Sequence, residues 1–395
     1  MQLSKIKVKE AMEKKGITKS QMSVMLSDKH SPIKSHIDKL CAYLDVDLFF
    51  LCDNLAFEMC NPKNNSKQKA ISCIELFAGS GGLALGLEQA GIHHSLLVEI
   101  NRTCCETLKH NRPHWPVLCK DIHNVDFHEY QGSVDLVTGG FPCQAFSYAG
   151  KKLGFEDTRG TLFYEFARCI QEVKPKMFMA ENVRGLKSHD HGRTLETILD
   201  VFSSLGYKVQ YQILNACYYG VGQKRKRIVI IGIRNNLNLS FEYPQADDHM
   251  TTLKDALRNC PASDGILYSE KKRKVMDLVP PGGCWVDLPE DIAKDYMGAA
   301  YYSTGGKRGM ARRIAWDEPC LTLTCSPIQK QTERCHPDET RPFTIREYAR
   351  IQSFPDDWTF AGGISDQYKQ IGNAIPVEMA RRIGLQLVIA LTETQ

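Results

Sequence analysis

The stretch Gly140-Phe141-Pro142-Cys143-Gln144 follows directly on an apolar run, residues 134–139, that is typical of a buried strand. The glycines where the two meet allow a sharp turn and let a ligand approach the backbone closely. The proline before Cys143 fixes φ and removes a hydrogen-bond donor, so it stiffens the loop. A thiol at the carboxyl end of a parallel strand would lie in the crevice where open α/β sheets bind ligands. Most cysteines are simply buried, and the other fourteen are interpreted that way, but Cys143 is a candidate functional residue.

The bulk composition excludes several classes of protein. The chain has 395 residues, 43% of them apolar, which suits two or three domains with a substantial core. A formal net charge of +4 is compatible with a polyanionic partner without requiring one. The chain contains no run of about 18 apolar residues and no apolar signal core, so we expect no membrane span and a cytoplasmic protein. Fifteen cysteines without any Cys-x-x-Cys pair predict reduced thiols and no structural zinc site.

Residues 1–60 are expected to form a separate helical unit. Residues 14–21 and 40–47 resemble parts of the helix-turn-helix domain of phage-repressor-type regulators. One helix is missing from that pattern between residues 26 and 31, where the recognition helix should lie. Operator binding and a plain packing role are therefore both open for this unit. The polar residues 61–69 form the expected linker.

Residues 70–234 alternate strand-like and helix-like segments. This alternation predicts a mostly parallel, Rossmann-like sheet with helices on both faces. Residues 235–339 break the rhythm with many prolines and glycines, so they are expected to form a smaller, irregular domain. Residues 340–395 return to ordered segments, and the apolar helix among them should dock back on the sheet. Strands are expected at 71–77, 95–99, 134–138, 177–180, 207–214 and 227–233, and helices at 82–90, 103–110, 161–173, 194–205, 345–352 and 377–391.

A glycine-rich turn, Phe77-Ala78-Gly79-Ser80-Gly81-Gly82, lies between a predicted strand and a predicted helix. Its glycines would bring the backbone close to a ligand, although an ordinary glycine-rich turn is an alternative. Glu99 ends the next strand, about 20 residues on, where an acidic residue binds ribose hydroxyls. Asp121, which follows the third strand-like segment, could hold an amino group. Because the turn lacks the phosphate-binding Gly-Lys-[Ser/Thr] ending, a nucleoside without a long phosphate chain, such as S-adenosylmethionine, is the expected cofactor.

Two further stretches place charged side chains beside predicted strands. Glu181 ends an apolar strand, and burial there would favour the protonated form that a general acid requires. A salt bridge at the strand end is the structural alternative. In Gln223-Lys224-Arg225-Lys226-Arg227 the odd-numbered residues share one face of a strand, and the two arginines suit phosphate and base contacts. The two lysines are interpreted as a solvated edge.

Taken together, these motifs resemble those of the cytosine-C5 DNA methyltransferase family of bacterial restriction–modification systems. The resemblance covers residues 71–234 and about 312–385, most of the chain. Any one motif is a weak signal, whereas their shared order and spacing are specific. The matching motifs are Phe77-x-Gly79-x-Gly81-Gly82, Glu99, Asp121, Gly140-Phe141-Pro142-Cys143-Gln144, Gly154-Phe155-x-Asp157-x-Arg159-Gly160-x-Leu162-Phe163, Glu181-Asn182-Val183, Gln223-x-Arg225-x-Arg227 and Gln370-x-Gly372-Asn373-Ala374-x-Pro376.

The resemblance implies that the chain methylates C5 of cytosine in a specific duplex DNA sequence, with S-adenosylmethionine as the methyl donor and no metal. Cys143 would add to C6 of a flipped-out base, and Glu181 would protonate or hydrogen-bond N3. Arg227 would hold the base carbonyl, and Arg225 would help to position the catalytic loop or a phosphate. The cofactor would contact Phe77, Ala78, Gly79, Gly81, Gly82, Leu83, Glu99, Ile100, Asp121, Ile122, Gly139, Pro142, Leu162 and Asn373.

The resemblance also assigns the remaining segments. Residues 146–159 resemble the mobile catalytic loop of the family, and residues 235–339 would form the target-recognition domain. Methylation of cytosine in tRNA is an alternative activity, and transcriptional regulation through residues 1–60 is an alternative or additional function. A monomer that is associated with the nucleoid through DNA is expected. In the target-recognition domain, phosphate contacts are expected from Lys271-Lys272-Arg273-Lys274, Lys307-Arg308 and Arg312-Arg313. The first of these stretches suits a solvated helix face equally well. Base contacts are expected from Thr304-Gly305-Gly306 and Thr322-Leu323-Thr324.

Overall fold

The computed structural model describes residues 70–142, 162–303 and 309–392. The chain divides into two units, residues 1–69 and 70–395, and every described residue belongs to the second. The predicted helical unit, Cys143 and the predicted catalytic loop therefore lie outside the described residues, as do Thr304-Gly305-Gly306 and Lys307-Arg308. Among the described ranges, no helix combines the length and the apolar character that a membrane crossing requires.

A seven-stranded sheet forms the centre of the second unit, with the strand order β3-β2-β1-β4-β5-β8-β6. Strands β1 to β5 run parallel, and β8 is antiparallel to both of its neighbours. Only residues 216–225 join β6 to β8, too few for the crossover of about a dozen residues that a parallel return requires. The predicted mostly parallel sheet is thus confirmed. Its strands are β1 (Ser72–Leu76), β2 (His93–Glu99), β3 (Val117–Cys119), β4 (Leu136–Gly139), β5 (Met177–Val183), β6 (Tyr207–Asn215) and β8 (Lys226–Arg234).

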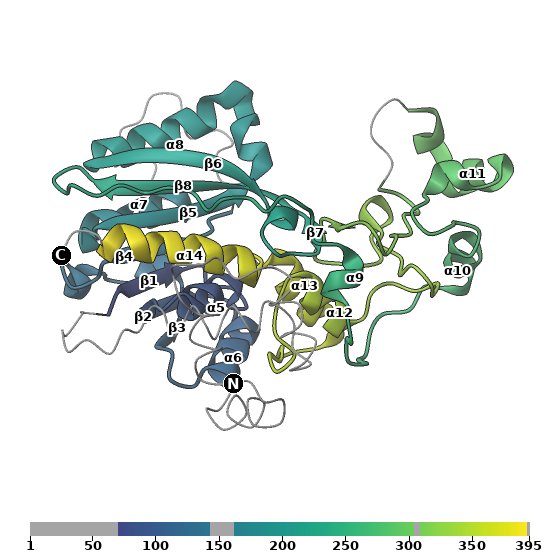
Figure 1. Cartoon of the computed structure of the whole chain (residues 1–395), viewed down its shortest axis with the longest axis horizontal. Coiled ribbons are helices and arrows are strands. Elements are labelled where there is room, and N and C mark those ends of the chain that lie inside the picture. Colours follow the sequence, from purple (N-terminus) through teal and green to yellow (C-terminus); the bar gives the residue numbers. More distant parts are fainter. Residues whose placement is uncertain (1–69, 143–161, 304–308, 393–395) are drawn as a thin grey trace, which may run out of the picture. The chain divides into compact units, whose positions relative to one another are not determined.

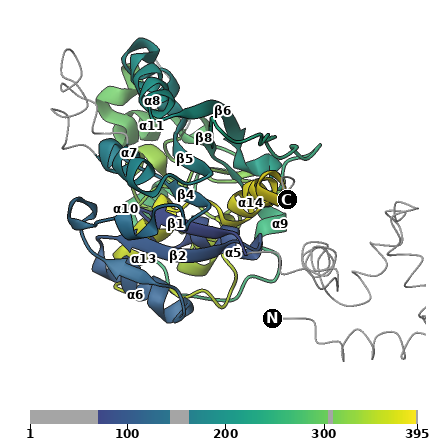
Figure 2. The same ribbon diagram turned by 90° about the vertical axis from the view of Figure 1, so that its left-hand side faces the viewer.

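Helices cover both faces of this sheet, as Figure 2 shows. On one face, α7 (Leu162–Val173) and α8 (Arg193–Ser204) bury apolar side chains against Ile74, Leu76 and Phe178 of the strands. On the other face, α5 (Gly82–Gln89) and α14 (Val377–Thr392) pack against Cys73 and Met177. Because both faces are covered, the central strands are apolar on both sides. The predicted two-faced α/β architecture is confirmed.

The carboxyl-terminal helix α14 lies directly against α5, the first helix of the described chain (Figure 1). Glycines permit this close approach. A Cβ atom on Gly86 would lie 2.5 Å from the carbonyl oxygen of Val377, and one on Gly384 would lie 2.8 Å from the Cβ of Ala90. The predicted docking of this helix on the sheet is therefore confirmed, and it brings the segment before α14 to the carboxyl ends of the strands.

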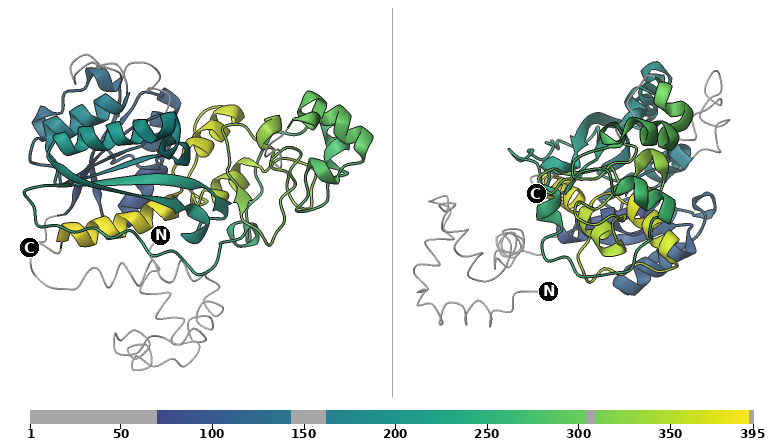
Figure 3. Two further views of the ribbon diagram at one scale, coloured as in Figure 1. Left: turned by 90° about the horizontal axis from the view of Figure 1, so that it is seen from above. Right: turned by 90° about the vertical axis from the view of Figure 1, so that its right-hand side faces the viewer.

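A smaller lobe, residues 235–303 and 309–339, extends away from the sheet (Figures 1 and 3). It has little regular structure, as expected, and a small core of its own that includes Tyr268, Met276 and Leu288. A short parallel pair, β7 with β9, joins the lobe to the segment before β8. The remaining elements are α6 (Arg102–Asn111), β7 (Gln223–Lys224), α9 (Leu253–Ala256), α10 (Glu270–Met276), α11 (Glu290–Met297), β9 (Cys320–Leu321), α12 (Ile345–Ile351) and α13 (Ile364–Asn373).

Three of the cations predicted to contact phosphates are engaged within the lobe itself. Lys272 forms an ion pair with the fully buried Glu333. Arg312 pairs with Glu318, and Arg313 is buried, where it donates to the backbone carbonyls of Val279 (2.7 Å) and Met276 (2.7 Å). These cations are engaged inside the lobe because buried carbonyl oxygens and a buried carboxylate would otherwise be left without partners. On α10 only the other face, with Lys271 at 87% exposed, remains open to solvent.

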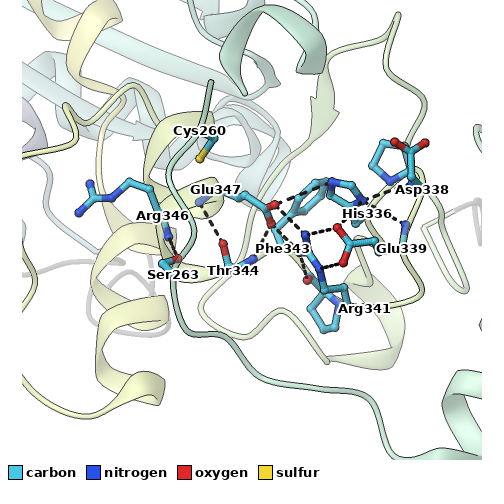
Figure 4. A network of polar contacts seen from close by, with 12 residues as sticks. Cys260, Ser263, His336, Asp338, Glu339, Arg341, Phe343, Thr344, Arg346 and Glu347 are labelled. Carbon is cyan, nitrogen blue, oxygen red and sulfur yellow. Dashed lines mark hydrogen bonds and ion pairs between the residues drawn. The ribbon is translucent and has the colours of Figure 1, made fainter. Parts of the chain in front are cut away.

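A polar network joins the end of the lobe to the start of α12 (Figure 4). Arg341 donates to both carboxylate oxygens of Glu347, at 2.7 and 2.9 Å, and to Glu339 at 3.0 Å. His336 is buried beside them, and its Nδ1 accepts the backbone N–H groups of Asp338 (3.3 Å) and Glu339 (3.2 Å). Burial lowers the pKa of His336, which agrees with a neutral ring that accepts hydrogen bonds. The network fixes the lobe to the helical segment that leads back to the sheet.

Candidate active site

The carboxyl ends of β1, β2, β4 and β5 open into one cavity of about 580 Å³. The cavity brings together residues that are far apart in the sequence, from the glycine-rich turn to the segment before α14. This is the place where an open α/β sheet binds its ligands. Of the predicted site residues, the cavity is lined by Phe77, Ala78, Gly79, Gly82, Leu83, Glu99, Pro142, Glu181, Arg225, Arg227 and Asn373.

The glycine-rich turn owes its shape to backbone angles and to a close neighbour. Gly79 (φ +56°) and Gly81 (φ +87°) are in the left-handed region that favours glycine. A Cβ atom on Gly82 would lie 2.2 Å from the carbonyl oxygen of Ile375, which leaves no room for a side chain. The turn therefore packs on the segment before α14, and at its glycines no side chain covers the backbone on the cavity side.

Glu99 holds this turn in place. One carboxylate oxygen accepts the backbone N–H of Gly79 at 2.7 Å, and the other accepts that of Asn101 at 2.8 Å. Each carboxylate oxygen has a further lone pair. Because Glu99 also lines the cavity, its remaining acceptor capacity suits the hydroxyl groups of a ribose.

At the other end of the cavity, Glu181 and Arg227 form an ion pair of 2.8 Å between Oε1 and Nε. The strand-end salt bridge that the sequence left open is thus present, and both side chains also line the cavity. Asn182 donates to the carbonyl oxygen of Phe141 at 2.8 Å, which ties the start of the Pro142–Cys143 loop to β5. A Cβ atom on Gly140 would lie 3.0 Å from Oε2 of Glu181, so the second glycine of the motif leaves room for the acid.

Arg225 has a different environment from Arg227. It is buried, and it donates to the carbonyl oxygens of Leu323 (3.2 Å) and Gly372 (3.1 Å). Burial lowers the pKa of Arg225 to about 9, so the side chain still carries its charge at neutral pH. Gln223 is also buried, whereas Lys226 is exposed, so burial alternates as predicted. The three residues do not share one strand, however, because Gln223 belongs to β7 and Arg227 to β8. Arg225 connects the segment before β8 to the lobe and to the segment before α14.

Several predicted cofactor contacts are not among the residues that line the cavity. Ile100 is 64% exposed, and Asp121 caps the short 3-10 helix Ile122–Asn124 by accepting the N–H of His123 at 3.1 Å. Ile122 belongs to the apolar core between the sheet and α7, and Leu162 packs against that core. Gly81 and Gly139 do not line the cavity either, although their sequence neighbours Ser80, Gly82 and Gly140 do.

Other residues that line the cavity were missed from the sequence. The most informative is Glu75, which lies within β1, is buried, and has a carboxylate oxygen without a partner among the described residues. A charged residue between Ile74 and Leu76, in the middle of an apolar strand, was the signal that could have revealed it. Together with the bare glycine turn and Glu99, this orphaned acid fits a cationic nucleoside, and S-adenosylmethionine is such a molecule.

Comparisons with known proteins agree with this geometry. The family model of C-5 cytosine-specific DNA methylases matches residues 71–388, and a Cro/C1-type helix-turn-helix DNA-binding domain model matches residues 1–48. The chain is 53% identical to Type II methyltransferase M.Sau96I of Staphylococcus aureus, over 97% of this chain and 95% of that protein. It is 56% identical to Type II methyltransferase M.Eco47II of Escherichia coli, over 80% of this chain and 78% of that protein.

Solved structures share the fold. A DNMT2 variant of Spodoptera frugiperda matches with a TM-score of 0.55 at 19% identity, over 81% of this chain and 99% of that one. The Entamoeba histolytica methyltransferase EhMeth matches with a TM-score of 0.56 at 16% identity, over 82% and 99% of the two chains. At this level of identity the likeness concerns the fold alone. From the match of the family model over residues 71–388 and the identity to the Type II methyltransferases, it follows that this chain belongs to the C-5 cytosine-specific DNA methylases and uses S-adenosylmethionine as its methyl donor.

Proposed function

We propose that this chain is the modification enzyme of a Type II restriction–modification system, in which Cys143 is the nucleophile and Glu181 and Arg227 hold the target cytosine. The observation that carries the residue assignment is the cavity itself. It places the Glu181–Arg227 pair and the glycine-rich turn around one space, with Pro142, the residue before Cys143, at its wall. The Type II methyltransferases at 53% and 56% identity support the biological role.

The chemistry required of the side chains follows from the substrate. C5 of cytosine is a poor nucleophile, and addition of a thiolate to C6 makes C5 enamine-like. Cys143 provides this thiolate. Glu181 hydrogen-bonds or protonates N3, which offsets the charge that the addition creates, and Arg227 fixes the orientation of Glu181 and holds the base carbonyl. One such interaction typically accounts for about 10²–10³ in rate. When bound, S-adenosylmethionine supplies the methyl group; a base then removes the C5 proton, and Cys143 leaves.

The target carbon lies within the stacked duplex, so the base must be flipped out to reach these residues. We infer that the lobe, within the proposed target-recognition domain 235–339, contacts the duplex beside the flipped base. The β7–β9 pair and the bond of Arg225 to Leu323 support this role, because they hold this part of the lobe beside the segment before β8. Thr322, Leu323 and Thr324 line the cavity directly.

We propose a second function for residues 1–60, the binding of operator DNA. The match to a Cro/C1-type helix-turn-helix model favours it over a plain packing role. The enzyme would then repress its own gene. Deletion of residues 1–60 is expected to abolish binding to the promoter fragment and to leave methylation intact. If promoter binding survives the deletion, this unit is not the operator-binding element.

Bisulfite sequencing of DNA from cells that express the protein tests the main proposal, and sequencing of their tRNA tests the alternative substrate. We expect methylated cytosines at one short DNA sequence, and none with Cys143→Ser. The same variant should still bind S-adenosylmethionine in calorimetry. Turnover by Cys143→Ser would contradict the covalent role of this residue. Sedimentation of the protein on a duplex tests the expected monomer.

A further inference from the structure

The basic run at residues 223–227 turns both of its arginines into the protein. Arg225 is buried and donates to two backbone carbonyls, and Arg227 pairs with Glu181. Lys226, which the sequence pattern assigned to a solvated edge, lies between them and is exposed. It forms no ion pair with any residue that the structure describes. The cation of this run that is left for a partner molecule is therefore the lysine beside the cavity.

Two more cations lie on the short 3-10 helix η4 (Arg184–Lys187), which follows β5 directly. Val183, the last residue of β5, lines the cavity, so η4 begins at the edge of the cavity. Leu186 is fully buried in the core beside α7 and α8, which fixes this helix to the sheet. Side chains three residues apart eclipse each other in a 3-10 helix, so Arg184 and Lys187 extend from the same side. Both are exposed, and neither forms an ion pair within the described ranges.

The antiparallel register of β5 and β8 brings these cations together. Val183 lies opposite Arg227, and both residues line the cavity. Arg184 and Lys226 are the next residues beyond this pair along the two segments, and η4 is in contact with β8. Arg184, Lys187 and Lys226 therefore follow one edge of the cavity, and we call them the basic rim. It lies at the end of the cavity that contains the Glu181–Arg227 pair.

Little negative charge offsets the basic rim along the segments that carry it. Residues 182–193 and 215–227 contain one acidic residue, Asp190, and this acid is paired with Arg193. The nearby Glu181 is likewise paired, with Arg227. Uncompensated cations in a row attract a polyanion, and a row along the edge of a cavity suits a phosphate backbone that passes over it.

We propose that the basic rim binds the phosphates of the DNA strand that carries the target cytosine. The inference rests on the proposed function, in which Glu181 and Arg227 hold the flipped-out base. A base at this end of the cavity remains joined to its own backbone, so the neighbouring phosphates must pass over this edge. Phosphate contacts carry no sequence information directly. The rim therefore raises the affinity for every duplex and leaves the choice of sequence to the lobe.

The salt dependence of DNA binding by the full-length protein tests this inference, because each phosphate contact releases counterions. Affinity is measured by fluorescence anisotropy on a duplex with the target site and on a scrambled duplex. S-adenosylhomocysteine is present, since it has no methyl group to donate. In the double variant Arg184→Gln and Lys226→Gln, the slope of log K against log salt should become shallower by about 1.8, or about 0.9 for each contact. The advantage of the wild type should then shrink about twelvefold from about 50 to about 200 mM salt, equally on both duplexes.

Lys208→Gln is the matched control, because it removes an exposed lysine from the other end of the β6–β8 pair, where Lys208 lies opposite Ile233. This variant should keep the salt slope of the wild type. The charge-preserving double variant Arg184→Lys and Lys226→Arg should restore most of the slope that the glutamines remove. Binding of S-adenosylmethionine in calorimetry should be the same for all variants, which shows that the cavity is intact.

An unchanged slope in the glutamine double variant would overturn the proposal. A loss of affinity confined to the target duplex would also overturn it, because that result means base readout. An equal change of slope with Lys208→Gln would contradict it too, since the effect would then be one of net charge. If the double variant does not fold, each single variant should show a slope shallower by about 0.9. A wild type that binds both duplexes but methylates neither would instead contradict the proposed function, so the two failures are distinct.

Discussion

Arg227→Met should destabilise the fold and abolish methyl transfer, because it leaves Glu181 without its partner. The pair is 2.8 Å long, and the side chains of Arg227 and Glu181 are only 12% and 10% exposed. Two unit charges about 4 Å apart attract by about 4 kcal/mol at an effective dielectric constant of about 20. Loss of one partner of a buried pair costs about 3–5 kcal/mol. Since this pair borders a cavity that water can enter, we expect a smaller loss of about 2–3 kcal/mol.

Urea unfolding of the two single variants and the double variant measures the interaction. Glu181→Gln removes the charge that Arg227→Met would leave unpaired, so the double variant should lose less stability than the sum of the single ones. The coupling energy should be about 1–3 kcal/mol. Arg102→Met, at an exposed position of α6, is the control and should change the free energy of unfolding by less than about 0.5 kcal/mol. Strictly additive losses would refute the argument that Arg227 holds the carboxylate of Glu181.

Three further predictions follow from single contacts. Gly82→Ala should lower the melting temperature and weaken cofactor binding in calorimetry, because the added Cβ would lie 2.2 Å from the carbonyl oxygen of Ile375. Gly185→Ala is the control and should change neither, because the nearest atom to its added Cβ is 4.0 Å away. Arg313→Met should expose the lobe to limited proteolysis while the sheet stays resistant, because it leaves buried carbonyls unsatisfied at about 1–3 kcal/mol each. Because the pKa of His336 is lowered in the folded protein, this histidine binds a proton more readily in the unfolded chain as the pH falls below 6.5. The free energy of unfolding should therefore decrease in that pH range, and His336→Gln should flatten this part of the pH profile in urea unfolding.

The sequence was sufficient to predict the elements whose pattern is local. The strand, glycine turn and helix at residues 72–89 follow from an apolar run, three glycines and a helical period, and the structure confirms them. The order of the sheet was less accessible. That β8 lies between β5 and β6 depends on pairing between distant strands, and no local pattern encodes it. The helix α13 was not predicted either, because Gly372 and Asn373 at its end resemble a loop.

Charged residues show the limit of local patterns more clearly. Lys272, Arg312 and Arg313 look like surface cations in the sequence, and only the tertiary structure reveals the buried acceptors that hold them. Glu181 and Arg227 were predicted from strand ends and alternation, but their ion pair depends on the antiparallel register of β5 and β8, in which Glu181 lies opposite Val229. Glu75 was missed because its neighbours made it look like a residue of a core strand.

The covalent step at Cys143 is the central claim, and trapping with a fluorinated base tests it most directly. A duplex amplified with 5-fluorocytosine in place of cytosine has no C5 proton to lose, so the adduct cannot resolve once the methyl group has been transferred. Incubation with S-adenosylmethionine should give a stable protein–DNA complex, and peptide mapping should place the modified base on Cys143. An adduct on any other of the fifteen cysteines, or methylation of ordinary DNA without any trapped complex, would contradict the account.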